Sequence, residues 1–465
     1  MSSFEDGFKA VLLRGNPIRE IGAEADRIAL SLGIPVVRLH LGNPSTTQFA
    51  ETKEAMLKSI SSRVSGYGPH PGSAAEKQQL ADFFNDSEGV PDHFIGEDAI
   101  FFPGATLITK ALGHIFEGRN SGILLSSPGY PVYENQALAD GLKVLHYQLD
   151  PVSCLVSFES LDSMIRSAAS EAINVRAVYI TFPHNPTGKA LTEAEALTMA
   201  GVVNRLNEAY PSLVIYNDSV YSATCAVTIG YNSIYPFLSD AARQRTISGV
   251  SGAKLASLGG ERVGGVVTKN VLLRTLLTNA QSQMTAGVSV HSIPGFLATT
   301  CLFKGQWKAG QATEASPRAC IANFYQERIS LVARGLGPRV LPFPPGGGMY
   351  VYADFAPFLK GKLVPPALQQ DVGSATLETG RHLRDLLLHA DKLGDGYVPV
   401  ATVNGEVFGE DASRMTLRIS CVERSLKALD YAVNTLRAVL CIVGELKDWD
   451  LPPPVDWNIA KNELL

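Results

Sequence analysis

Apolar side chains recur every three or four positions in several stretches of the chain, which predicts amphipathic helices. The first two such stretches cover residues 18–33 and 50–63, and residues 36–42 between them predict a short strand that ends in a turn. A further helix is expected after Ser73, because Ser73 and Glu76 stand at the spacing of a capping box. The chain therefore begins as helix, strand and helix.

From about residue 66 to residue 270 the pattern changes to short apolar runs that alternate with helical stretches. The runs are rich in Val and Ile and apolar on both faces, which is typical of buried strands. One intervening helix is expected over residues 192–210, with Thr192 and Glu195 as a second capping box. The pattern predicts an α/β fold with a mostly parallel sheet flanked by helices. The expected strands are 99–102, 122–127, 143–149, 177–182, 213–218, 246–251 and 263–268.

Beyond residue 319 strands and helices mix less regularly, as in an α+β domain. A long helix is followed by strands at 349–355, 397–402 and 414–420 and by a closing helix at 424–443. The segment 448–457 is broken by prolines, so we expect it on the surface. The expected organisation is an N-terminal segment (1–65) that belongs to a small domain, a large domain (66–318) and the C-terminal part of the small domain (319–465).

Composition and charge narrow the function. The 465 residues are 45% hydrophobic and 18% charged, with a formal net charge of -5 and no block of basic residues. These values argue against nucleic acid or a membrane as the main partner and favour a soluble protein that acts on small molecules. Glu5 and Asp6 stand where a secretory leader would be basic, so we expect a cytoplasmic protein. The six cysteines and nine histidines show no spacing typical of metal ligands, so no metal site is expected.

The most informative stretch is 247–265, ISGVSGAKLASLGGERVGG, which places Lys254 in a glycine-rich loop. Ser251 stands three residues before this lysine and Arg262 eight residues after it. A lysine that is partly desolvated loses its charge readily, and the neutral amine can attack an aldehyde to form a Schiff base. The guanidinium of Arg262 is suited to binding a phosphate. The stretch therefore indicates a site for a phosphorylated aldehyde.

Further candidates follow the other predicted strands. The carboxyl ends of parallel strands form the edge where α/β sheets bind ligands. A Gly-Ala-Thr helix start suits a phosphate, an aromatic ring can stack, and an amide, a carboxylate and a phenol can bond a heterocycle. Together with Lys254 and Arg262 these are the groups that a pyridoxal phosphate site needs. The candidates, in chain order, are Gly104, Ala105, Thr106, Tyr130, Asn185, Asp218 and Tyr221.

The motifs PGYPVY, HNPTG, DSVY and SGAKLASLGGERVGG, in this order, resemble those of the class I/II aminotransferases, which are fold type I pyridoxal-phosphate enzymes. The resemblance extends from about Ile18 to Ser420 and covers nearly the whole chain. It implies a large domain with a mostly parallel sheet and a smaller α+β domain built from both chain ends. It also implies pyridoxal 5'-phosphate as the cofactor.

The resemblance assigns a role to each candidate. Lys254 would form the Schiff base and later move the substrate proton, and Asp218 would pair with the pyridine nitrogen. Tyr221 and Asn185 would bond the ring hydroxyl, and Tyr130 would stack on the ring. The residues implied for the phosphate are Gly104, Ala105, Thr106, Ser251 and Arg262.

The resemblance also identifies residues for the substrate and for a second subunit. Arg418 matches the arginine that binds the α-carboxylate, with Arg414 as the rival candidate. Gly42 and Asn43 match the turn that closes over the substrate. Tyr67 matches a tyrosine that reaches the phosphate of the neighbouring subunit, which implies a homodimer with shared active sites.

The chain departs from the family pattern at some positions. Ala253 precedes the lysine where the family often has a serine, and the segment 403–414 lacks the usual proline–glycine pair. The sequence marks no second arginine for a dicarboxylate substrate. His184 and Lys110 could touch substrate, but we interpret them as a loop residue and a helix-face cation.

Three functions compete at this point. The leading hypothesis is an aminotransferase that moves an amino group from an L-amino acid to a 2-oxo acid. The alternative is a fold type I lyase or synthase that eliminates, replaces, cyclises or forms carbon–carbon bonds, for example on S-adenosylmethionine. A third is a binding or regulatory protein without catalysis, against which the joint presence of Lys254, Asp218 and Arg418 argues.

Overall fold

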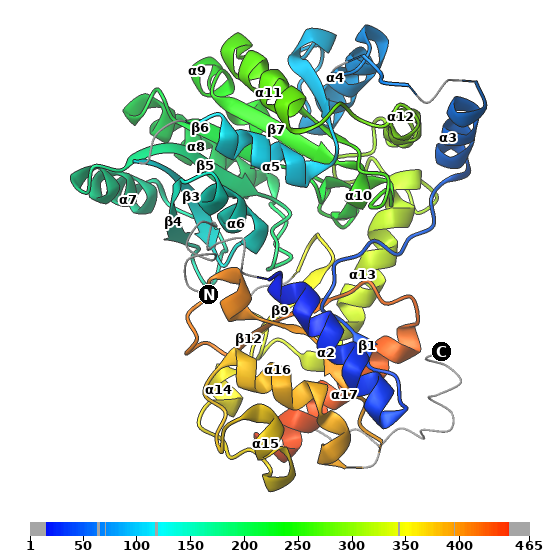
Figure 1. Cartoon of the computed structure of the whole chain (residues 1–465), viewed down its shortest axis with the longest axis vertical. Helices are drawn as coiled ribbons and strands as arrows, with labels where there is room; N and C mark the ends of the chain where they lie inside the picture. The colour runs from blue at the N-terminus through cyan, green and yellow to red at the C-terminus, as the bar shows by residue number, and fades with distance from the viewer. Residues whose placement is uncertain are drawn as a thin grey trace, which may run out of the picture.

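The computed structural model describes residues 15–62, 66–69, 71–116, 120–342, 345–394 and 396–445. The expectations for the N-terminal residues Glu5 and Asp6 and for the segment 448–457 lie outside these residues. The chain forms a large lobe around one sheet and a small lobe that holds β9, β12 and α2, and α13 (Pro317–Leu336) runs from one lobe to the other (Figure 1). In the described residues no helix combines the length and hydropathy needed to cross a membrane.

A seven-stranded sheet forms the centre of the large lobe, in the order β2-β8-β7-β6-β5-β3-β4. Strand β8 runs antiparallel to its neighbours β2 and β7, and the remaining neighbours pair in parallel. The predicted α/β fold with a mostly parallel sheet is thus confirmed. The strands are β2 (Ala99–Phe102), β3 (Ser121–Ser127), β4 (Lys143–Gln148), β5 (Asn174–Thr181), β6 (Val214–Asp218), β7 (Thr246–Ser251) and β8 (Gly264–Val267).

Helices cover both faces of this sheet because its strands are apolar on both sides. In β2, Ile100 and Phe102 belong to the core that this sheet shares with α5, α6 and α11, whereas Ala99 and Phe101 belong to the core on the opposite face, which includes residues of α4, α7, α8 and α12. The helices are α4 (Ala74–Glu88), α5 (Ala105–His114), α6 (Pro131–Ala139), α7 (Phe158–Ser170), α8 (Glu193–Ala209), α9 (Asp240–Arg243), α10 (Gly252–Leu255), α11 (Val271–Met284) and α12 (Ser292–Leu302).

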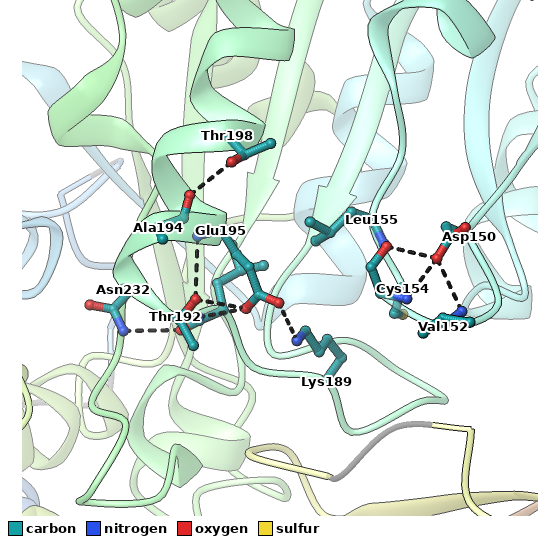
Figure 2. A network of polar contacts seen from close by, with 12 residues as sticks. Asp150, Val152, Cys154, Leu155, Lys189, Thr192, Ala194, Glu195, Thr198 and Asn232 are labelled. Atoms are coloured by element: carbon teal, nitrogen blue, oxygen red, sulfur yellow. Dashed lines mark hydrogen bonds and ion pairs between the residues drawn. The ribbon is translucent and has the colours of Figure 1, made fainter.

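Both capping boxes expected from the sequence are present. Ser73 and Glu76 close the first turn of α4, and Thr192 and Glu195 close that of α8. Figure 2 shows Glu195 between Thr192 and Lys189, whose Nζ lies 2.6 Å from a Glu195 oxygen. Because a cap satisfies backbone N–H groups that the helix leaves free, the start of α8 is fixed. The ion pair ties the loop that ends β5 to this helix start.

The small lobe contains an antiparallel sheet in the order β11-β12-β9 and a short parallel pair, β1 with β10. Its strands are shorter than the sequence pattern predicted, most clearly at 36–42 and 397–402, where only Val37–Arg38 (β1) and Val400–Ala401 (β10) form strands. The elements are α2 (Pro17–Leu32), β1 (Val37–Arg38), β9 (Tyr350–Asp354), α14 (Ala356–Leu359), α15 (Gln369–Val372), α16 (Gly380–Leu388), β10, β11 (Val403–Asn404), β12 (Thr416–Ser420) and α17 (Leu426–Ile442).

The N-terminal segment touches both lobes. Helix α2 packs on the small lobe through a core that includes Ile21, Ala401 and Phe408, and β1 pairs with β10. Helix α3 (Ala50–Ser62) instead packs on α12, where the hydroxyls of Thr52 and Thr299 lie 2.7 Å apart. The assignment of all residues 1–65 to the small domain did not anticipate this contact. The domain boundaries themselves stay a prediction.

Candidate active site

A cavity of about 700 Å³ opens between the lobes, where β3, β5, β6 and β7 end. It is lined by residues that the sequence spreads over about 400 positions, from Asn16 to Arg418, and that the fold brings together. Most of the predicted site residues line it; their roles stay predictions. These residues are Gly42, Asn43, Ala105, Thr106, Tyr130, Asn185, Asp218, Tyr221, Ser251, Lys254, Arg262 and Arg418.

Lys254 lies in the short helix α10, which directly follows the C-terminal end of β7. Its Nζ donates a hydrogen bond to the carbonyl oxygen of Gly42. Burial, together with the smaller effect of the charges of Arg418 and Arg262, lowers the pKa of Lys254 to about 8. Because the pKa lies near neutrality, a sizeable fraction of this amine is uncharged at pH 7 to 8 and can act as a nucleophile or a base.

Ala253, the residue before the lysine, departs from the family pattern. Ser251 nevertheless stabilises the start of helix α10. The hydroxyl of Ser251 accepts a hydrogen bond from the Ala253 N–H at 3.2 Å. Ser251 therefore caps the helix that carries Lys254. The backbone of Ala253 contributes to this arrangement even though its side chain has no hydroxyl.

Asp218 lies at the end of β6 and is 1% exposed. One carboxylate oxygen accepts the N–H of Val220 at 3.1 Å, and the hydroxyl of Tyr133 donates to the other. Burial raises the pKa of Asp218 to about 6, while these two hydrogen bonds act in the opposite direction. The carboxylate is therefore mostly ionised at pH 7. It can accept a hydrogen bond from a protonated ring nitrogen.

The N-terminus of α5 and the side chain of Arg262 form an anion cradle. Gly104, the N-cap of α5, adopts φ +81°, and a Cβ at this position would lie 2.8 Å from Nη2 of Arg262. Arg262 itself has φ 51° and donates from Nη1 to the carbonyl of Gly259 at 3.0 Å. Only glycine leaves room for the guanidinium beside the free N–H groups of the helix. A phosphate suits such a combination of helix dipole and arginine.

Arg418, in β12, is a buried cation on the small-lobe side of the cavity. Its Nη1 donates to Asn185 Oδ1 at 3.2 Å and its Nη2 to the carbonyl of His40 at 2.5 Å. The guanidinium also lies over the rings of Tyr350 and Phe408, 4.5 and 4.8 Å from their centroids. No acidic side chain among the described residues forms an ion pair with it. A buried arginine whose charge is not balanced by an acidic side chain is suited to binding a carboxylate ligand.

The rival arginine occupies a different environment. Arg414 forms ion pairs with Glu410 at 2.9 Å and with Asp354 at 3.1 Å, and it does not line the cavity. Its charge is therefore already compensated by the protein. The geometry favours Arg418 over Arg414 as the group that meets a ligand.

Two tyrosines in the cavity wall were not singled out by sequence reasoning. Tyr133 belongs to the PGYPVY motif, and its position one turn after Tyr130 was the only available signal. Tyr350 comes from β9, and its hydroxyl lies 2.9 Å from that of Tyr221. Nothing in the sequence around Tyr350 indicates this contact, because it joins residues 129 positions apart.

Arginines also occur at the rim of the cavity, where the sequence marked none. Arg19 and Arg38 both line it, and Arg38 forms an ion pair with Asp26 of α2. Both partners of this pair are substantially exposed, so the pair contributes little to stability.

The remaining predicted residues lie elsewhere. Gly104 borders the cavity through its neighbour Ala105, and Tyr67 is 90% exposed and outside the lining. Lys110 pairs with Asp140, and both ring nitrogens of His184 face hydroxyls, those of Ser126 and Thr187. Neither Lys110 nor His184 lines the cavity.

Comparison with known proteins agrees with this geometry. The family model "Aminotransferase class I and II" matches residues 34–436. Similar curated proteins include a cystine lyase from Arabidopsis thaliana, 26% identical over 199 residues (42% of this chain, 46% of that protein). Another is tyrosine aminotransferase from Caenorhabditis elegans, 24% identical over 260 residues (55% and 53%). The chain matches only about half the length of these relatives.

Among solved structures, the aspartate aminotransferase from Rhizobium meliloti superimposes with a TM-score of 0.76. It is 20% identical, and the match covers 93% of this chain and 96% of that one. At this identity the likeness establishes the fold, and the family match over most of the chain establishes the family. The chain belongs to the class I and II aminotransferase family.

Proposed function

We propose that this protein is a pyridoxal-phosphate-dependent aminotransferase that moves an amino group from an L-amino acid to a 2-oxo acid. The observation that carries the proposal is the meeting of Lys254, Asp218 and Arg418 in one cavity. A half-buried amine, a buried carboxylate and a buried cation without an acidic partner in the described chain are costly to hold together unless ligands use them.

The residues present fit the cofactor. The cradle of Gly104, Thr106 and Arg262 suits its phosphate, and Asp218 suits its ring nitrogen. Tyr130 is positioned in the wall as a ring that can stack. When bound, pyridoxal phosphate supplies an aldehyde and an electron-poor ring that stabilises negative charge at the α-carbon of an amino acid.

The chain's own groups would do the rest. Arg418 would bind the substrate α-carboxylate and, with Asn185, orient the α-carbon. Lys254, once its amine is free, would remove the α-proton and return a proton at the acceptor carbon. Its lowered pKa suits both directions of this transfer. Asp218 would keep the ring nitrogen protonated.

The proposal includes a cytoplasmic homodimer with shared active sites. Tyr67 supports it, because this large side chain is 90% exposed and lies outside the cavity of its own chain. In a dimer, the partner subunit would cover the ring of Tyr67, and this ring would lie beside the phosphate cradle of the partner subunit.

Adding a panel of L-amino acids to the cofactor-loaded protein tests the function. With its amino donor, the protein is expected to convert the cofactor from its aldehyde to its amine form and to release a 2-oxo acid, as followed by visible absorbance and product analysis. Turnover of an amino acid or S-adenosylmethionine without formation of the amine form would instead support the lyase or synthase alternative. Failure to bind pyridoxal phosphate would refute both.

Replacing Arg418 with lysine tests whether this residue binds the α-carboxylate of the substrate. Lysine keeps the charge but loses the two-pronged donor geometry, so KM for the amino acid should rise roughly 10- to 100-fold, the value of a charged hydrogen bond. The matched variant Arg414→Lys changes an arginine only four positions away that is already paired. Its KM should stay within about twofold of the native value, since it touches no ligand. Equal effects of the two variants would contradict the assignment.

A further inference from the structure

The hydroxyl of Tyr221 has two hydrogen-bonding neighbours in the cavity wall. Asn185 Nδ2 lies 3.3 Å from it and the Tyr350 hydroxyl 2.9 Å. All three side chains are buried. Their hydrogen bonds can therefore be assigned from what each group is able to donate and accept.

Arg418 determines the orientation of Asn185. A guanidinium can only donate, so the Asn185 atom 3.2 Å from Nη1 must be its amide oxygen. The amide nitrogen then faces Tyr221, and nitrogen can only donate. Tyr221 therefore accepts one hydrogen bond from Asn185.

Either hydroxyl could donate the hydrogen bond between the two tyrosines. Donation by Tyr350 is the direction that the proposed role of Tyr221 requires, because it leaves the Tyr221 proton for the ring oxygen of the cofactor. Tyr221 then accepts two bonds, which fills the acceptor capacity of its oxygen. Its own proton is left to point into the cavity, where a ligand can accept it.

Tyr350 is held in place on two further sides. The guanidinium of Arg418 lies 4.5 Å above its ring. Gly42 contacts its hydroxyl so closely that a Cβ on this glycine would overlap it. The carbonyl of the same glycine accepts the hydrogen bond from Lys254. Tyr350 thus contacts the proposed carboxylate arginine, the proposed ring tyrosine and the residue that holds the lysine.

We infer that Tyr350 is a positioning residue, which donates to Tyr221 and thereby directs the Tyr221 proton at the ring oxygen of the cofactor. The inference rests on the proposed function. A hydrogen bond to that oxygen stabilises its anionic form and so favours loss of the proton from the nitrogen that joins the cofactor to Lys254. Tyr350 therefore lowers the pKa of this nitrogen.

The variant Tyr350→Phe tests the inference, because it keeps the ring against Arg418 and removes only the hydroxyl. The pH midpoint of the visible absorbance of the cofactor-loaded protein should rise by about 0.3 to 1 unit, the value of one hydrogen bond. KM for the amino acid should change less than about threefold, since the ring contact with Arg418 remains. A merely structural role would leave the midpoint where it is.

Two further variants make the test decisive. Tyr352→Phe removes a buried hydroxyl from the same strand, one bonded to Glu410 and Thr416 outside the cavity, and should leave the midpoint unchanged. In a Tyr221→Phe background, Tyr350→Phe should add no further shift, because it acts through the missing hydroxyl. An unchanged midpoint in Tyr350→Phe, or a full shift in that background, would overturn the inference. A native protein that binds no cofactor would instead overturn the proposed function.

Discussion

The variant Lys254→Ala is expected to lose the visible absorption of the covalently bound cofactor and about four orders of magnitude or more of turnover, since it removes both the nucleophile and the proton-transfer base. Lys254 is half-buried in the cavity wall, and the pKa of its amine is lowered to about 8. In the described chain, no other lysine lines the cavity to replace it. Visible spectra of the loaded protein and steady-state rates with its amino donor measure the two effects.

Lys110→Ala is the matched control. Lys110 also follows a strand of the sheet, but its amine pairs with Asp140 and lies outside the cavity. This variant should keep both the absorption and the turnover. Retention of both properties in Lys254→Ala would show that the assignment of the lysine is wrong.

Asp218→Asn is expected to lower turnover by about 10³-fold, because a neutral amide does not stabilise positive charge on the ring nitrogen. The same variant has a stability signature in the cofactor-free protein. The pKa of Asp218 is raised from 3.8 to about 6, so the folded state prefers the protonated acid. Its contribution to stability is present at low pH and is lost as the pH rises through 6.

Denaturant unfolding of the cofactor-free proteins between pH 4 and pH 7 checks this sign. Relative to Asp218→Asn, the native protein should gain up to about 3 kcal/mol in free energy of unfolding as the pH falls across this range. A gain in the opposite direction would refute the assigned environment of the carboxylate.

Glu88→Gln separates burial from function. Glu88 is fully buried, bonds Ser233, and burial raises its pKa to about 7, yet it lies outside the cavity. Its variant should show a comparable pH dependence of stability with turnover within about twofold of native. Loss of turnover in both variants would indicate that the Asp218 effect comes from a disturbed core.

The sequence was most informative where local chemistry alone sets the structure. The strand 99–102 and the capping boxes at Ser73 and Thr192 appear as expected, because burial on both faces and cap hydrogen bonds depend on neighbouring residues. It was least informative for the small-lobe strands and for α3. There the length of a strand and the partner of a helix depend on which distant surface is available.

The sequence by itself determined the alternation of buried strands and helices, the strand ends near Asp218 and Asn185, and the place of Lys254 directly after a strand, although the expected loop there is the short helix α10. These features follow from the periodicity and spacing of residues that are close together in the sequence. Only the tertiary structure decided that Arg418 rather than Arg414 faces the cavity, and that Tyr133 and Tyr350 bond Asp218 and Tyr221. Such contacts join segments far apart in the chain. The contact between Tyr133 and Asp218 forms when α6 packs beside the sheet, and those of Tyr350 and Arg418 form only when the two lobes pack against each other.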